Sequence, residues 1–80
     1  MRVLLFGRLR DVAGWREKEF DSPPATLGGL RELLAQVDAN LGAALCGPGV
    51  QAAIDKVLAR GDVSLTGVVE VAFMPPMSGG

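Results

Sequence analysis

Residues 68–80 decide the fold that we expect for this chain, and they read Val68-Val69-Glu70-Val71-Ala72-Phe73-Met74-Pro75-Pro76-Met77-Ser78-Gly79-Gly80. Residues 68–74 are mostly apolar and predict a β-strand, which then meets Pro75 and Pro76. Proline fixes φ near −65° and has no N–H to donate, so the sheet cannot continue through this pair. We therefore expect a strand with a stiff exit, followed by a flexible tail over residues 75–80.

The end of this tail is thin, because glycine has no Cβ and Gly79-Gly80 can enter a slot that larger side chains would block. This ending suggests that Gly80, with its free α-carboxylate, is itself the reactive group. The alternative is an inert chain end, because termini often carry small residues and are often poorly ordered. The preceding Pro75-Pro76, attached to a strand, makes the pattern more specific than a chance pair of glycines.

The composition limits the classes of function that we consider. The chain has 80 residues, so we expect a single domain over 1–80. Its formal net charge is −1 and it has no basic stripe with interleaved aromatic residues, so we expect no nucleic-acid partner. It has no apolar run long enough to span a membrane and no signal-peptide cleavage site, so we expect no membrane contact and a cytoplasmic location.

The chain has one cysteine, Cys46, and neither histidine nor tyrosine. A single cysteine cannot form an internal disulfide, which fits a reducing compartment. The missing residue types include the commonest general base and the commonest zinc ligand, so we expect no metal site. These absences favour a carrier or a binding module over an enzyme.

The apolar pattern predicts the order ββαββ for the main elements, with a short helical turn and a short return strand in addition. We expect strands at 2–9, 15–20, 50–54, 57–59 and 68–74, a main helix at 27–37 and a short helical turn at 41–45. Thr26 is the expected N-cap of the main helix, and Asp55-Lys56 the expected hairpin turn. A mixed sheet with one main helix packed on one face, and a possible parallel pair of first and last strands, is the α+β arrangement called β-grasp.

Alternation along the first and last strands divides their side chains between two faces. We assign four residues to the helix side: Val3, Leu5, Val71 and Phe73. Four others are then left on an uncovered face: Leu4, Phe6, Ala72 and Met74. An exposed apolar patch usually marks a partner site, although a loop or the helical turn at 41–45 could cover this one.

Three stretches resemble the molybdopterin synthase small subunit family. They are Phe6-Gly7-Arg8-Leu9-Arg10-Asp11 with Ala13-Gly14, the helix start Thr26-Leu27 with Leu30, and the C-terminal run from Glu70 to Gly80. The resemblance spans the chain and is strongest at its two ends. The family implies a ubiquitin-like β-grasp fold and the role of a sulfur carrier.

The resemblance also implies a chemistry for Gly80. A ubiquitin-activating-like adenylyltransferase would use ATP to adenylate the Gly80 carboxylate, so the carrier would hold no bound cofactor itself. The adenylate would become a thiocarboxylate, which delivers sulfur to cyclic pyranopterin monophosphate in molybdenum cofactor biosynthesis. On this interpretation the chain is non-catalytic alone and forms a hetero-oligomer with the large synthase subunit.

We interpret Gly79 and Gly80 as the reactive end and seven residues as contacts to partners: Phe6, Arg10, Met74, Pro75, Pro76, Met77 and Ser78. Phe6 and Met74 could instead belong to the core, and Arg10 could simply be solvated. Three alternatives for the whole chain stay open at this point. It could carry sulfur for another pathway, such as thiamine or amino-acid synthesis, it could be a ubiquitin-like protein modifier, or it could be a binding module with an inert tail.

Overall fold

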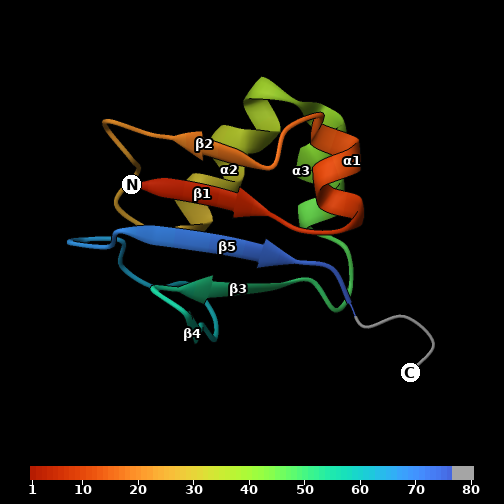
Figure 1. Ribbon diagram of the computed structural model, residues 1–80. Helices are drawn as coiled ribbons and strands as arrows, with labels where there is room; N and C mark the ends of the chain where they lie inside the picture. Colours follow the sequence, from red (N-terminus) through yellow and green to blue (C-terminus); the bar gives the residue numbers. More distant parts are fainter. Residues whose placement is uncertain (77–80) are drawn as a thin grey trace.

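The computed structural model describes residues 1–76, whose strands form one sheet with helices packed against it (Figure 1). In chain order the elements are β1 (Arg2–Leu5), α1 (Arg8–Ala13), β2 (Glu17–Glu19), α2 (Leu27–Val37), α3 (Ala39–Leu45), β3 (Gln51–Ile54), β4 (Val57–Leu58) and β5 (Glu70–Met74). No helix in this part of the chain combines the length and the apolar character that crossing a membrane requires.

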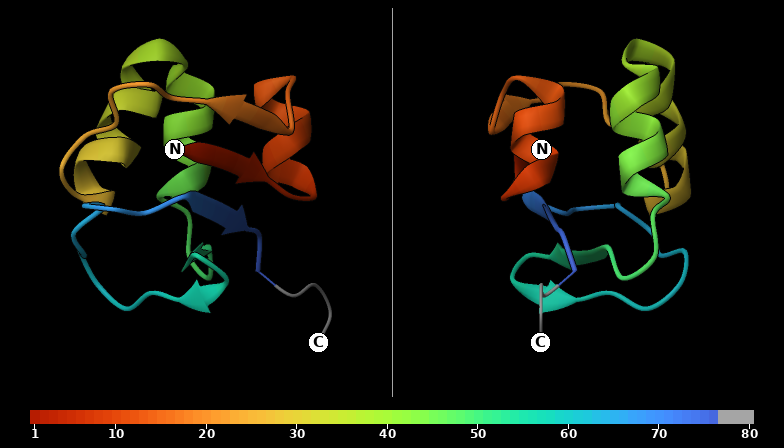
Figure 2. Two further views of the ribbon diagram at one scale, coloured as in Figure 1. Left: turned by 60° about the vertical axis from the view of Figure 1, so that its left-hand side comes forward. Right: turned by 90° about the vertical axis from the view of Figure 1, so that its right-hand side faces the viewer.

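The strands of the described residues lie in the order β2-β1-β5-β3-β4. β1 and β5 are parallel, with Leu5 opposite Phe73, and this confirms the expected pairing of the first and last strands. The other neighbouring pairs are antiparallel. β5 is therefore the central strand of the sheet and lies between β1 and β3 (Figures 1 and 2).

The predicted main helix is confirmed as α2. The Oγ1 atom of Thr26 accepts a hydrogen bond from the backbone N–H of Gly29 at 3.1 Å, so Thr26 is the N-cap. Leu27, Leu30 and Leu34 are buried against the sheet, as their helical spacing predicted. Val37 is instead 71% exposed, because it is the last residue of α2 and the chain turns there into α3.

The expected strand at 2–9 is wrong beyond Leu5. At Gly7 the chain adopts φ 56° and ψ −131°, a conformation that residues with a Cβ rarely take, and the helix α1 begins at Arg8. Leu9 is 2% exposed and Val12 packs against the core, so α1 contributes an apolar side of its own. The sequence signal for this helix was the spacing of Leu9, Val12 and Ala13, which the apolar run before it obscured.

The remaining boundaries differ from the expected ones by a few residues. The strands at 15–20, 50–54, 57–59 and 68–74 are present but shorter, and the helical turn at 41–45 is the longer helix α3. Asp55 and Lys56 form the predicted turn, with φ 48° and 72°. The Oδ1 atom of Asp55 also accepts hydrogen bonds from the N–H groups of Val69 and Glu70, at 3.0 and 2.9 Å, which ties this turn to the start of β5.

Candidate functional site

The candidate site consists of the end of β5, the adjoining sheet face and the helix α1. Four predicted site residues lie outside the described residues: Met77, Ser78, Gly79 and Gly80. The structure does describe the base from which they follow. β5 ends at Met74, and Pro75 and Pro76 come after the sheet, as their missing N–H groups predicted.

The two prolines pack back toward the helices. Pro75 is half-buried and Pro76 is exposed, and both border an apolar groove of about 420 Å³. The other walls of the groove include Leu9 of α1 and Ala44 of α3, while Arg8 supplies a charge at its border. The groove therefore places Pro75 and Pro76 next to α1 and α3.

The sheet face opposite α2 carries the apolar row that the sequence predicted. Strand register places four side chains of this face next to one another across β1, β5, β3 and β4, namely Leu4, Ala72, Ala53 and Leu58. Phe6 extends the row beyond the end of β1 and is 48% exposed, while Leu4 and Met74 are half-buried. We call these residues, together with Met74, the open face.

Ala72 corrects the expectation that this whole row is exposed, because it is only 6% exposed. Its methyl group is short and lies on the central strand, between Leu4 and Ala53 in register. Leu58 was missed by sequence reasoning, although it is 56% exposed on the same face. The two-residue turn at Asp55-Lys56 implies the pairing of Ala53 with Leu58, so the signal was present in the sequence.

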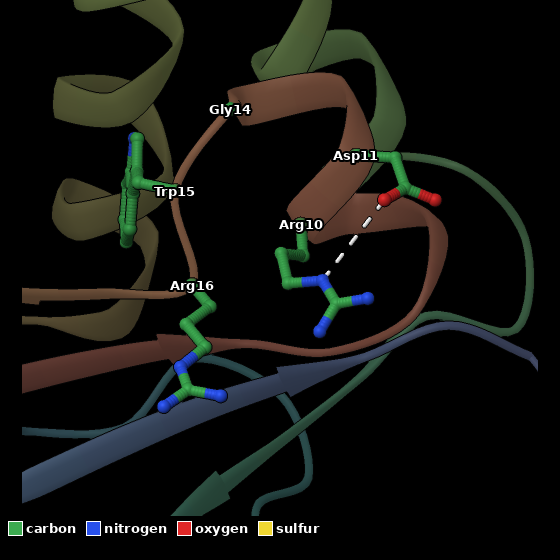
Figure 3. Close-up of a pocket in the computed structure, with 5 residues that line it drawn as sticks. All are labelled: Arg10, Asp11, Gly14, Trp15 and Arg16. Carbon is green, nitrogen blue, oxygen red and sulfur yellow. Dashed lines mark ion pairs between the residues drawn. The ribbon is translucent and has the colours of Figure 1, made fainter.

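Arg10 lies on α1 and not at the end of a strand, which follows from the correction at Gly7. Its side chain is 52% exposed, and its Nε lies 3.9 Å from Oδ1 of Asp11. Arg10 lines a surface hollow of about 400 Å³, and Arg16, which follows α1, lines it as well (Figure 3). Both arginines also line a second hollow, of about 290 Å³, whose wall includes Phe6. A pair of guanidinium groups therefore flanks the apolar open face.

The described residues contain a partly exposed apolar surface and the base of the C-terminal tail. Residues 1–76 contain no group of three or more potential metal-ligating side chains. Cys46 is exposed just after α3, away from the strands.

Comparison with known proteins agrees with this architecture. The molybdopterin synthase sulfur carrier subunit of Escherichia coli (strain K12) is 32% identical over 80 residues, which cover 100% of this chain and 99% of that protein. The crystal structure of SAMP1 from Haloferax volcanii matches with a TM-score of 0.73 and 26% identity, over 99% of this chain and 97% of that chain. The second match confirms the ubiquitin-like β-grasp fold.

The resemblance noted in the sequence is thereby confirmed over the whole chain and not only at its ends. The ThiS family matches residues 3–80, so the match includes the C-terminal glycines as well as the folded part. The chain belongs to the ThiS family.

Proposed function

We propose that this protein is the sulfur carrier subunit of a molybdopterin synthase, with Gly80 as the residue that carries the sulfur. The observation that best supports this proposal is the 32% identity to the Escherichia coli molybdopterin synthase sulfur carrier subunit over both full lengths. The Gly79-Gly80 ending adds the chemical group that such a role needs. The location that fits this role is the cytoplasm.

The proposed chemistry begins with activation of the tail. An oxygen of the Gly80 carboxylate attacks the α-phosphorus of ATP, which releases pyrophosphate and leaves an acyl adenylate. Sulfide, as HS⁻, then attacks the carbonyl carbon, and AMP leaves with the electron pair of the broken C–O bond. The product is a thiocarboxylate, which is ionised at neutral pH and needs no general base from its own chain.

The second stage delivers the sulfur. The thiocarboxylate sulfur attacks a carbon of cyclic pyranopterin monophosphate, and an oxygen substituent leaves that carbon with the electron pair of the broken C–O bond. Water then hydrolyses the acyl–sulfur bond, which restores the Gly80 carboxylate and leaves the sulfur on the pterin. Two charged carriers supply the two sulfur atoms of one dithiolene. The carrier contributes the nucleophile, and the catalytic side chains belong to its partners, which is consistent with a chain that has no histidine.

We assign two protein partners to the carrier. A ubiquitin-activating-like adenylyltransferase activates Gly80, and the large synthase subunit accepts the charged tail in a hetero-oligomer. The open face is the surface that we propose for docking, because it is apolar, partly exposed and next to the base of the tail. Met77 and Ser78, which precede the glycines in the sequence, would then follow them into the partner's pocket.

The ThiS family match supports one alternative, a sulfur carrier for another pathway such as thiamine synthesis. The activation chemistry is the same in that case, and only the acceptor differs. The two functions can be distinguished by identifying which partner protein and which acceptor molecule take the sulfur from the thiocarboxylate.

Intact mass spectrometry tests the proposal directly. The chain is incubated with the adenylyltransferase, ATP and sulfide, and we expect a mass gain equal to replacing one oxygen by sulfur, located on the Gly80 fragment. A chain that lacks Gly80 is the control and should gain nothing. Addition of the large subunit and the pterin precursor should then restore the original mass.

Two results would contradict the proposal. If the full chain gains no sulfur and behaves like the Gly80-deleted control, the carrier chemistry is wrong. If the thiocarboxylate forms but is discharged only by the enzymes of thiazole synthesis, the chain carries sulfur for the other pathway.

A further inference from the structure

Two glycines flank the point where the chain leaves the sheet. A Cβ placed on Gly7 would lie 2.9 Å from Cγ of Pro75, and a Cβ placed on Gly49 would lie 2.7 Å from Cβ of Pro76. Carbon atoms that are not bonded do not approach this closely without a shift of one of them. Each of the two consecutive prolines is therefore packed against its own glycine.

The sheet topology explains why these two glycines come together. β5 lies between β1 and β3, so the end of β1 and the beginning of β3 stand on its two sides. Gly7 comes two residues after the end of β1, and Gly49 two residues before the start of β3. The N–H of Phe6 donates to the carbonyl of Phe73 at 3.1 Å, which holds the chain next to Gly7 against the end of β5.

Among the described glycines with positive φ, the close approach is specific to these two positions. Among the described residues, Gly7, Gly14, Gly49, Gly61 and Gly67 all have positive φ. A Cβ on Gly14, Gly61 or Gly67 would meet no atom within 4 Å. A left-handed backbone therefore does not by itself bring a glycine against a neighbour. The two crowded glycines of this set meet the two successive prolines of the tail base, whereas Gly42, which lies inside α3, is crowded by Ala35 of α2.

We infer that Gly7 and Gly49 form a seat for Pro75 and Pro76 that sets the direction in which the reactive tail leaves the domain. They are positioning residues for the sulfur-transfer reaction, and this inference rests on the proposed function. Because proline restricts the backbone, a shift at the seat is passed on to the residues that follow. A displacement of about 1 Å at a reacting group can lower a rate by roughly a hundredfold.

Gly49→Ala is the decisive variant, and Gly61→Ala is its matched control. Gly49 has φ 80° and Gly61 has φ 74°, so alanine meets similar backbone strain at both positions, but only residue 49 has Pro76 next to it. We expect both variants to stay folded, with a lower thermal midpoint for Gly49→Ala because only its Cβ meets Pro76. In single-turnover assays with the charged carrier, we expect Gly49→Ala to transfer sulfur roughly ten- to hundredfold more slowly than wild type, and Gly61→Ala at the wild-type rate.

The affinity for the large subunit separates positioning from a general loss of structure. The seat lies at the base of the tail, so Gly49→Ala should bind the large subunit with a dissociation constant close to that of wild type while its transfer step is slow. Equal transfer rates for Gly49→Ala and Gly61→Ala would overturn the inference. The inference would also be overturned if Gly49→Ala bound the large subunit so much more weakly that the lost affinity explained the whole loss of rate.

A double-mutant cycle provides a readout that does not depend on sulfur chemistry. Pro76→Gly removes the Cβ that alanine at position 49 would strike, so Gly49→Ala should destabilise the Pro76→Gly protein less than it destabilises wild type. A non-additive change in the free energy of unfolding, measured with a denaturant, would establish the contact between residues 49 and 76. Additive changes would overturn the proposed seat. If wild type carries no sulfur at all, the proposed function fails, while this cycle still reports on the seat.

Discussion

The two faces of the central sheet differ in what they do for the protein. On the face covered by α2, the side chains of Val3, Val71 and Phe73 have no exposed surface. On the open face, Phe6 and Leu58 leave about half of their side-chain surface in contact with solvent. Alternation along β1 and β5 places Leu4 and Ala72 on the open face between these covered residues, and Leu58 joins them from β4.

This difference indicates a division between folding and recognition. A covered face stabilises the fold through burial, at roughly 25 cal/mol for each Å² removed from water. An apolar open face gains that stabilisation only when another protein covers it. Substitutions on the first face should therefore lower the free energy of unfolding, and substitutions on the second should lower the affinity for a partner.

Phe73→Ala should have the largest effect, because the Phe73 ring is fully buried on the covered face. Loss of a buried phenylalanine costs about 3–5 kcal/mol, a large part of the stability of a small domain. Urea unfolding followed by circular dichroism measures this loss. A midpoint within error of wild type would show that the covered face does not dominate the stability.

The sequence predicted the elements of the covered face well. Leu27, Leu30 and Leu34 recur at helical spacing behind a threonine cap, so local pattern and tertiary packing agree in α2. The helix α1 was missed because six residues show less than two full turns of periodicity. Its start also depends on the backbone of Gly7, and a φ of 56° cannot be read from a glycine in sequence alone.

Phe6→Ala makes the same chemical change on the open face and is the matched partner of Phe73→Ala. Since Phe6 is 48% exposed, its loss should change the free energy of unfolding by less than about 1 kcal/mol. Affinity for the large subunit should fall roughly tenfold or more, because partly exposed aromatic residues often dominate interfaces. Isothermal titration calorimetry measures the affinity. The division between the faces fails if Phe6→Ala unfolds as easily as Phe73→Ala, or binds as tightly as wild type.

The candidate site could be predicted only in part, because it joins residues that are distant in the sequence. The identity of the tail residues follows from the sequence, since two prolines and two glycines have few structural interpretations. The contacts of the tail base do not, because Gly7 and Gly49 reach the prolines through strand order alone. Leu58 joins the open face by the register of a two-residue hairpin, which single-strand patterns do not report.

Arg10 and Arg16 should have the smallest effect on folding, because both side chains are exposed. Removing both charges with Arg10→Gln and Arg16→Gln should leave the unfolding midpoint nearly unchanged. The two guanidinium groups line a hollow that Phe6 also borders, so carboxylates of a partner that covers Phe6 would come close to them. Exposed ion pairs contribute about 0.2–1 kcal/mol each, so the double variant should bind the large subunit roughly two- to thirtyfold more weakly at low salt.

The dependence of this loss on salt distinguishes charge from shape. Ions screen exposed charges, so the difference from wild type should shrink as the salt concentration rises. The control is Lys56→Gln with Arg60→Gln, which removes the same amount of charge next to β4, at the edge of the sheet opposite β2. An equal loss of affinity in the control would mean that only the net charge matters. A loss of affinity that persists at high salt would mean that the two arginines contribute packing to the interface. The border of the open face would then bind a partner in the same way as its apolar centre does, and not through charge.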